Sequence, residues 1–318
     1  MSKRKYSEIN NFENLDINNY FVEYEVIKKI KKQSSNGSGA FSKIFKVNCE
    51  RSNYAFKVTQ SKSNENAINE ALILKKLNKA KCPYILNLVR FGYSNILERF
   101  ILQTNYYEYD LGYIIKKVNI SDKKKCHIYE CISKGLNYLH SNKIIHCDVK
   151  PQNILICRNL EIVKICDFNI SIINNSKNIS SNAYKVSRYY RPPELFLRKY
   201  FSEKIDIWSF GIIMYEMESN KKFVINKGNI YNYLSNIQDL IGDIKFSDSD
   251  KKFVRKNLKD DEIYHLFSNY KVESALINTL SENKYFSLLK NCLKYNEKER
   301  YSASQVCDFF MNLKYKII

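Results

Sequence analysis

A short polar stretch, His146 to Asn153, has the residue types and the spacing that phosphoryl transfer needs. Within it, Asp148 can accept the proton of an attacking hydroxyl, and Lys150 can neutralise charge that grows on the transferred phosphoryl group. Asn153 and the later Asp167 offer the hard oxygen ligands that Mg²⁺ prefers. A polar turn capped by Asp and Asn is the alternative interpretation, but the complete spaced set favours catalysis.

A glycine-containing stretch lies earlier in the chain, in the sequence GSGAFSKI, which begins at Gly37. Gly37 and Gly39 would permit a tight turn whose backbone N–H groups closely approach phosphates. Ser42 and Ile44 follow in the same stretch. Two glycines are a weak signal, so a flexible Ser/Gly linker stays open as the alternative.

A lysine and a glutamate follow at a suggestive distance. Lys57 ends an apolar, strand-like run, and Glu70 lies thirteen residues later in a segment with helical periodicity. A lysine at the end of such a strand usually extends into solvent. Paired with Glu70, it could instead hold its ammonium group against nucleotide phosphates.

The composition describes a folded chain with a large excess of positive charge. Its 318 residues include 52 Lys and Arg against 33 Asp and Glu, which gives a formal net charge of +19. Hydrophobic residues make up 44% and aromatic residues 14%, enough for a sizeable core, and this excludes an intrinsically disordered chain. The charge indicates either a nucleic-acid binder or a basic enzyme for a negatively charged ligand. No basic block or known binding motif occurs, so we do not expect nucleic acid as a partner.

Cysteine usage and the N-terminal residues predict an intracellular protein. The nine cysteines are scattered and form no CxxC pair, so they suit reduced thiols better than disulfide bonds or a zinc site. Residues 1–16 lack the apolar core of a secretory signal, and the apolar run 205–217 is too short to cross a bilayer. We expect a monomer in the cytoplasm or nucleus, with no membrane partner.

The first hundred residues are predicted to be β-rich with one helix. Alternation of apolar residues predicts strands at 21–30, 40–49, 54–59, 85–92 and 99–105. Residues 31–39 are expected to form a polar loop. Ala67, Ala71, Leu74 and Leu77 recur at helical spacing and predict a helix over 64–78.

The rest of the chain changes character. Ser121 can cap a long helix that ends at His140, and short strands are expected at 143–146, 154–157 and 163–165. From residue 204 onwards the pattern is mostly helical. A small β-rich lobe followed by a larger helical lobe is a two-lobed α+β arrangement.

Taken together, these motifs resemble a eukaryotic-type protein kinase over about residues 21–312. Three later stretches extend the resemblance: YYRPPE (189–194) is similar to the end of an activation segment, DIWSFG (206–211) to the start of a helix, and NEKER (296–300) to a late arginine motif. The resemblance implies a buried ion pair between Glu194 and Arg300. It also implies that Asp206 braces the catalytic loop.

The resemblance further implies the domain layout. Residues 1–20 would be a polar tail and residues 21–318 a protein kinase domain. Within this domain, the N-lobe would cover about 21–104, the hinge about 105–109 and the C-lobe about 110–318.

The resemblance also implies the ligands, ATP and Mg²⁺, and the residues that hold them. Lys57, tethered by Glu70, would contact the α- and β-phosphates, whereas Asn153 and Asp167 would bind the metal. Thr104 would be the gatekeeper, Tyr107 a hinge residue, and Ala55 and Leu155 would enclose the adenine ring. The full set expected at the nucleotide is Gly37, Gly39, Ser42, Ile44, Ala55, Lys57, Glu70, Thr104, Tyr107 and Leu155.

The stretch SRYYRPPE (187–194) is similar to the group that contains cyclin-dependent, MAP, glycogen synthase and dual-specificity tyrosine-regulated kinases. Some members of that group carry an activating phosphotyrosine where Tyr184 stands, and Arg188 and Arg191 would be its cationic partners. Tyr184 could equally be an ordinary loop tyrosine. The substrates would be proteins phosphorylated on Ser or Thr, at proline-directed or acidic sites.

Three positions depart from the kinase pattern. Asn169 replaces the glycine of DFG, Cys147 replaces the arginine of HRD, and Ser42 stands at the third glycine of the loop. Asn tolerates positive φ better than most residues, so we expect Asp167 to stay functional and the segment to be stiffer. The sequence thus predicts an ATP-dependent protein serine/threonine kinase with Asp148 and Lys150 as catalytic residues. The alternative is a pseudokinase scaffold that keeps the fold without turnover.

Overall fold

The computed structural model divides into two compact units. The first comprises Met1–Glu108 together with Cys166–Ile170, and the second comprises Tyr109–Ile165 together with Ser171–Ile318. The structure describes residues 37–38, 42–49, 52–60, 64–94, 96–174, 179–180, 187–197, 200–223, 230–267 and 273–315. The expected tail at 1–20 and the expected strand at 21–30 lie outside these residues.

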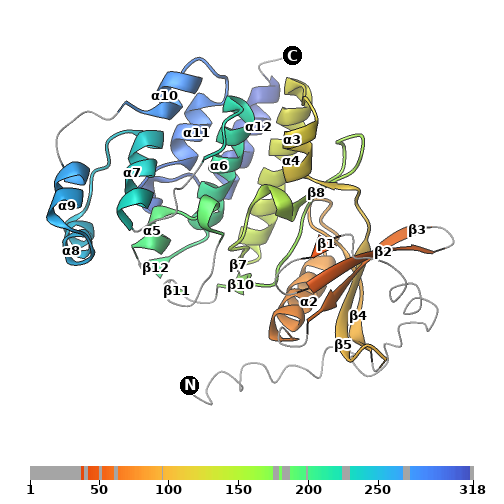
Figure 1. Cartoon of the computed structure of the whole chain (residues 1–318). Coiled ribbons are helices and arrows are strands. Elements are labelled where there is room, and N and C mark those ends of the chain that lie inside the picture. Colours follow the sequence, from red (N-terminus) through yellow and green to blue (C-terminus); the bar gives the residue numbers. More distant parts are fainter. Residues whose placement is uncertain are drawn as a thin grey trace. The chain divides into compact units, whose positions relative to one another are not determined.

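The first unit is built on a five-stranded antiparallel sheet with strand order β1-β2-β3-β5-β4 (Figure 1). The strands are β1 (Gly37–Ser38), β2 (Ser42–Cys49), β3 (Ser52–Thr59), β4 (Leu88–Ser94) and β5 (Arg99–Asn105). Phe45, Val47, Phe56 and Ile101 are buried together and form a core cluster of this sheet. Alternate residues of β2 therefore face the core, as the period of two in its sequence predicted.

Two residues that were predicted to lie in a loop form a short strand. Residues 31–39 were expected to be a loop, but Gly37 and Ser38 form β1 and pair with Ile44 and Lys43 of β2. The prediction was wrong at these two residues because a strand this short carries no periodicity of its own. Its conformation depends on the backbone pairing offered by the neighbouring β2.

The helix α2 (Asn64–Asn78) has the predicted bounds. The apolar residues that predicted it, Ala67, Ala71, Leu74 and Leu77, are all buried. The following strand begins later than expected, at Leu88 instead of residue 85. The Asn78 side chain donates to the Leu88 carbonyl at 2.7 Å and accepts from its N–H at 3.4 Å, which ties the end of the helix to the start of the strand.

The second unit is mainly helical, so the chain has the predicted α+β class. Its α-helices are α3 (Leu111–Lys117), α4 (Asp122–Ser141), α5 (Pro193–Phe196), α6 (Lys204–Ser219), α7 (Ile230–Ile241), α8 (Asp248–Asn257), α9 (Asp260–Phe267), α10 (Ala275–Leu280), α11 (Phe286–Cys292) and α12 (Ala303–Tyr315). No helix in the part of the chain that the structure describes is long and apolar enough to cross a membrane.

Short strands join these helices. A three-stranded sheet has the order β6-β8-β9, and two pairs are formed by β7 with β10 and by β11 with β12. Their bounds are β6 (Tyr109–Asp110), β7 (Ile144–Ile145), β8 (Ile154–Ile156), β9 (Val163–Ile165), β10 (Ile172–Ile173), β11 (Ile179–Ser180) and β12 (Tyr200–Phe201). β8 and β9 form an antiparallel hairpin, in which Ile154 pairs with Ile165.

Two helices form the centre of the second unit. Along α4, Ile128, Ile132, Leu136 and Leu139 are fully buried on one face. Ser121 is the N-cap residue of α4, as predicted, although its side chain makes no capping hydrogen bond. Most of α6 is buried on every side, which is expected for a helix that is apolar all round and lies inside a domain.

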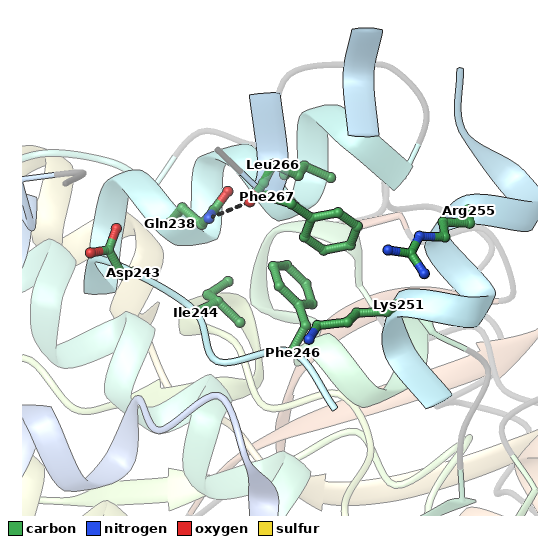
Figure 2. A pocket seen from close by; sticks show the side chains of 8 residues that line it. All are labelled: Gln238, Asp243, Ile244, Phe246, Lys251, Arg255, Leu266 and Phe267. Carbon is green, nitrogen blue, oxygen red and sulfur yellow. Dashed lines mark hydrogen bonds between the residues drawn. The ribbon is translucent and has the colours of Figure 1, made fainter. Parts of the chain in front are cut away.

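A pocket of about 410 Å³ lies among α7, α8 and α9 of the second unit (Figure 2). Phe246 and Phe267 meet inside it in an edge-to-face arrangement, with ring centroids 5.1 Å apart. Its lining residues are Gln238, Asp243, Ile244, Phe246, Lys251, Arg255, Leu266 and Phe267. None of the residues that predicted phosphoryl transfer is among them.

Candidate active site

In the first unit, a lysine bridges two carboxylates. Lys57 Nζ lies 2.7 Å from Glu70 Oε2 and 2.6 Å from Asp167 Oδ1. β3 supplies Lys57, which pairs with Ile44 of β2 on one side and Leu102 of β5 on the other. The predicted Lys57–Glu70 pair is therefore present, and Asp167 joins it. The alternative in which Lys57 extends freely into solvent is wrong.

The two carboxylates determine the charge of Lys57. Burial alone would lower its pKa, but the negative charges of Glu70 and Asp167 outweigh burial and raise the pKa of Lys57 well above its ordinary value. Glu70 itself is only 2% exposed. Lys57 is therefore a fixed cation at neutral pH, positioned on a rigid strand.

The segment that carries Asp167 has one residue in an unusual conformation. Asp167 has φ of 68°, in the left-handed region, whereas Asn169 is not among the described residues with positive φ. The left-handed backbone conformation of this segment is therefore at Asp167. Phe168, between them, is fully buried.

In the second unit, Asp148 is the centre of a polar cluster. Lys150 Nζ donates to its Oδ2 at 2.6 Å, and Asn153 Nδ2 donates to the same oxygen at 3.1 Å and to the Asp148 carbonyl at 2.8 Å. Asn153 lies in the 3₁₀ turn η3 (Pro151–Asn153), which brings it back to Asp148. The three residues that the sequence grouped by spacing are thus in direct contact.

One member of this cluster was not predicted. The Ser187 backbone N–H donates to Asp148 Oδ1 at 3.2 Å, and the Ser187 hydroxyl accepts from Lys150 Nζ at 3.0 Å. Ser187 opens the stretch SRYYRPPE, but its spacing from Asp148 gave no sign of the contact. A hydroxyl residue at the start of that motif is the signal that could have identified it.

The backbone of the catalytic stretch is held by Asp206. Asp206 accepts from the N–H of His146 at 2.9 Å and from the N–H of Cys147 at 3.0 Å, and His140 Nε2 lies 2.9 Å from its Oδ2. The predicted bracing role of Asp206 is confirmed. It fixes the two residues that directly precede Asp148.

Cys147 cannot take over the role of an arginine. Its side chain is 1% exposed and its φ is 69°. Burial, followed by the charges of Asp206 and Asp148, raises the pKa of the Cys147 thiol well above its ordinary value. Cys147 is therefore a neutral, buried side chain that offers no charge to a phosphorylated loop.

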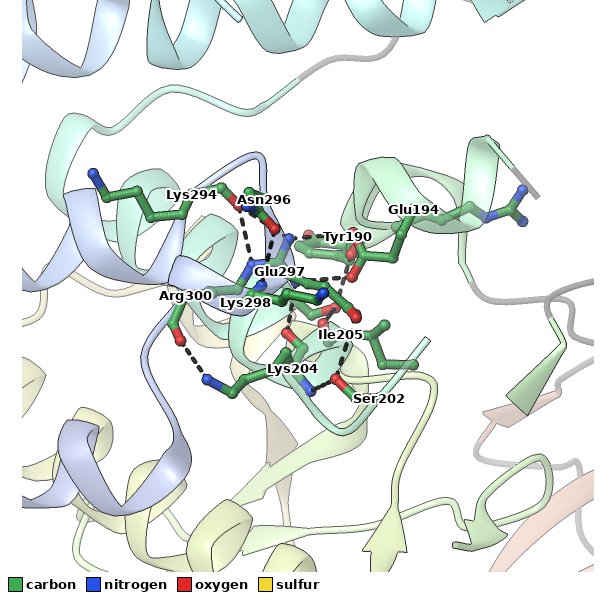
Figure 3. Close-up of polar contacts among 12 residues, drawn as sticks. Tyr190, Glu194, Ser202, Lys204, Ile205, Lys294, Asn296, Glu297, Lys298 and Arg300 are labelled. Carbon is green, nitrogen blue, oxygen red and sulfur yellow. Dashed lines mark hydrogen bonds and ion pairs between the residues drawn. The ribbon is translucent and has the colours of Figure 1, made fainter. Parts of the chain in front are cut away.

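The predicted buried ion pair is also confirmed (Figure 3). Arg300 Nη1 and Nη2 donate to the two carboxylate oxygens of Glu194 at 2.9 and 3.2 Å. The remaining N–H groups of Arg300 donate to the carbonyls of Lys204 and Lys294. Bidentate geometry and full use of its donors allow a charged group to stay buried.

The other predicted ligand residues are divided between the two units. Thr104 is buried on β5 opposite Ala55 of β3, Ser42 is buried, and Ile44 is 37% exposed. The first unit contains Gly37, Ser42, Ile44, Ala55, Lys57, Glu70, Thr104, Tyr107 and Asp167, and the second contains Asp148, Lys150, Asn153 and Leu155. Gly39 and Tyr184 lie outside the described residues.

Each unit contains donors whose chemistry fits phosphate and magnesium. Lys57 and Lys150 are cations suited to phosphate oxygens, while Asn153 and Asp167 supply hard oxygen atoms. Because Asn153 donates through Nδ2, its Oδ1 is the atom suited to a metal ion. Asp167 contacts Lys57 through Oδ1, so its second carboxylate oxygen is the atom suited to a metal ion.

The sequence is similar to several proteins named as kinases. A probable cyclin-dependent serine/threonine-protein kinase of Dictyostelium discoideum is 33% identical over 57% of this chain and 13% of its own length. Glycogen synthase kinase 1 of Pyricularia oryzae is 27% identical over 87% of this chain and 71% of its own length. A cyclin-dependent kinase 4 homolog of Caenorhabditis elegans is 25% identical over 84% and 67%, respectively.

The chain thus spans between 13% and 71% of the length of these relatives, which carry the names of the kinase group that the sequence resembles. The model of the protein kinase domain matches residues 30–310, which include every described residue of both polar clusters. The chain therefore belongs to the protein kinase family.

Proposed function

We propose that this protein is an ATP-dependent protein serine/threonine kinase that transfers the γ-phosphoryl group to hydroxyls of protein substrates. The observation that carries the proposal is the cluster around Asp148, in which Lys150, Asn153 and Ser187 hold one carboxylate by both oxygens. A purely structural turn has no need of a lysine 2.6 Å from the aspartate.

The first unit supplies the nucleotide side of the reaction. Lys57 would contact the α- and β-phosphates. Its ammonium group is held by Glu70, whose Oε2 lies 2.7 Å from Lys57 Nζ. Backbone groups of Gly37, Gly39 and Ser42 would approach the phosphates. Ile44, Ala55, Thr104 and Tyr107 of this unit would contact the adenine ring. Leu155 of the second unit is the remaining residue that the resemblance expects there.

The second unit supplies the acceptor side. Asp148 orients the substrate hydroxyl and takes its proton on a carboxylate oxygen, while Lys150 stabilises negative charge on the phosphoryl group in flight. Asn153 of this unit and Asp167 of the first unit are the residues that would hold Mg²⁺, which neutralises phosphate charge when it is bound. Because Lys150, Asn153 and Ser187 already fix Asp148, little reorientation is needed at the moment of transfer.

One experiment tests the activity. The protein is incubated with labelled ATP, Mg²⁺ and a generic basic protein substrate, beside Asp148→Asn and Lys57→Met variants. We expect transfer by the wild-type chain and a loss of at least about 100-fold in both variants. Lys57→Met removes a cation from the phosphates, and Asp148→Asn removes the group that accepts the hydroxyl proton. Transfer no greater than in the variants would leave the scaffold that keeps the fold without turnover.

The substrate class and regulation extend the same proposal. The net charge of +19 would favour acidic substrate segments by long-range attraction, so acidic peptides should lose their advantage as salt rises. Proline-directed sites are the second class to compare in the same assay. Autophosphorylation on Tyr184 is tested by Tyr184→Phe, and full activity of this variant would contradict an activating role.

A further inference from the structure

The residue that precedes Glu70 on α2 also contacts the metal-binding segment. Asn69 Nδ2 lies 3.3 Å from the carbonyl oxygen of Phe168 and 3.3 Å from that of Asn169. All three residues belong to the first unit. The proposed phosphoryl transfer gives Asn69 no role, and the kinase motifs in the sequence do not include it.

The amide group of Asn69 suits this double contact. A side-chain NH₂ carries two hydrogens, so each carbonyl can receive a hydrogen of its own. The two acceptors belong to consecutive residues, which means that one side chain fixes a stretch of main chain and not a single group. Asn69 is partly buried, where a hydrogen bond is screened less than at the surface.

Glu70, the next residue of α2, also interacts with the main chain of Phe168. The Phe168 backbone N–H interacts favourably with the Glu70 carboxylate, while the Phe168 carbonyl accepts from Asn69. Two neighbouring residues of α2 therefore hold both polar groups of one residue. Asp167, directly before Phe168, is the residue with φ of 68°. Since a non-glycine residue rarely adopts this conformation, the surrounding contacts have to maintain it.

The hydrogen bond between Lys57 and Asp167 does not by itself maintain the conformation of Asp167. It fixes a carboxylate oxygen, but rotation of the Asp167 side chain and movement of its backbone are both compatible with a contact at one atom. The contacts from Asn69 fix the main chain that follows. Together they define where the second Asp167 oxygen points.

We propose that Asn69 is a positioning residue that holds the main chain of Phe168 and Asn169 on α2, and thereby keeps Asp167 in the orientation needed for metal binding. The hydrogen bonds and the rigidity of the segment do not depend on the proposed function. Only the catalytic consequence rests on the chain being an active kinase.

Two variants of the full-length chain remove the contact. Asn69→Leu keeps a similar side-chain size and has higher helix propensity, so α2 should form at least as well. Asn69→Ala removes the amide with the smallest residue that favours helices. The matched control is Asn78→Ala on the same helix. Asn78 also donates to a backbone carbonyl, that of Leu88, and it does so from the last residue of α2, nine residues after Asn69.

The first measurement is hydrogen exchange of the protein without nucleotide. In both Asn69 variants we expect peptides covering residues 166–170 to exchange about 2- to 10-fold faster, the range for loss of a hydrogen bond of ordinary net strength. Asn78→Ala should leave these peptides unchanged and speed exchange near Leu88. Unchanged exchange of 166–170 in both Asn69 variants would overturn the proposal.

The second measurement is the Mg²⁺ concentration that gives half-maximal phosphoryl transfer. It should rise several-fold in Asn69→Leu and stay at the wild-type value in Asn78→Ala, even though the control lowers the melting temperature. If the wild-type chain transfers no phosphate but exchange at 166–170 still increases, the proposed function fails and the positioning role stands. If the chain is active and neither exchange nor the Mg²⁺ requirement changes, the positioning role fails.

Discussion

Ser187 and Lys150 hold Asp148 by different oxygens: the Ser187 backbone N–H donates to Oδ1 at 3.2 Å, and Lys150 Nζ donates to Oδ2 at 2.6 Å. The Ser187 hydroxyl in turn accepts from Lys150 at 3.0 Å, which closes a ring of three residues. The carboxylate is thus held in one plane before any substrate arrives. The hydroxyl of Ser187 acts through Lys150, whereas its backbone acts on Asp148 directly.

Removal of the Ser187 hydroxyl should impair catalysis more than nucleotide binding. Ser187→Ala keeps the backbone N–H but frees Lys150, and we expect kcat to fall about 10-fold or more, because a hydrogen bond to a charged group is lost. The KM for ATP should change little, and Ser187→Thr should restore most of kcat. Ser141→Ala is the control, since that hydroxyl only donates to the Tyr138 carbonyl on its own helix. A raised KM with unchanged kcat would contradict this role.

The stability of a Lys57→Met variant should depend on pH. In the wild type, the raised pKa of Lys57 means that its ion pairs stabilise the fold fully below the unfolded pKa of about 10.4, and this contribution is lost as the pH rises through the folded value. In the variant, Glu70 loses its partner, so burial raises the pKa of Glu70 without compensation. A carboxyl group whose pKa is higher in the folded state than in the unfolded state binds a proton more tightly when folded. The stability of the variant therefore increases as the pH falls through the pKa of Glu70.

The difference in melting temperature between the wild type and Lys57→Met should therefore shrink from pH 8 to pH 5.5. A second change, Lys57→Met with Glu70→Leu, removes the buried charge and should abolish this pH dependence. Thermal melts at each pH provide the measurement. A difference that stays constant across the range would show that Glu70 does not carry the effect.

Breaking the buried ion pair should cost much of the stability of the second unit. Arg300→Met leaves Glu194 buried without its partner, and we expect the free energy of unfolding to fall by about 3–5 kcal/mol. Glu194→Leu combined with Arg300→Met should cost less than Arg300→Met alone, because no uncompensated charge remains. Arg255→Ala, at an exposed position, serves as the control in denaturant unfolding. A double variant no more stable than Arg300→Met would contradict this explanation.

Restoring the family's glycine at position 169 should not help. Asn169 is not among the described residues with positive φ, so glycine relieves no strain there and adds freedom to the unfolded chain. We expect Asn169→Gly to lower the free energy of unfolding by about 0.5–1 kcal/mol, with no gain in activity. Denaturant unfolding and the transfer assay measure the two effects. A stabilised or more active variant would show that Asn169 is strained.

Local patterns in the sequence predicted most of the regular elements. The helix over 64–78 and the strands at 99–105 and 163–165 have the predicted bounds, because their periodicity is a property of the segment itself. β1 was missed since two residues show no period. The start of β4 was missed because the contact of Leu88 with Asn78, and not propensity, fixes it.

The site was predicted where a motif groups its members and missed where contacts cross long stretches of sequence. Asp148, Lys150 and Asn153 lie within one short run, so their spacing revealed the cluster. Ser187 reaches Asp148 across 39 residues and Asn69 reaches Phe168 across 99. No spacing rule links such positions, and only the folded chain brings them together.

The first unit combines two separate stretches of the chain, and this affects when it can fold during synthesis. Residues 166–170 belong to that unit, where Asp167 completes the charge pairing of Lys57. A nascent chain that has emerged only to Glu108 has the sheet and α2 of this unit. It still lacks the Asp167 carboxylate that pairs with Lys57 and the Phe168 and Asn169 carbonyls that Asn69 contacts. The unit can finish folding only after residue 170 has left the ribosome, so a fragment cut at Glu108 should be less stable than the same residues in the whole chain.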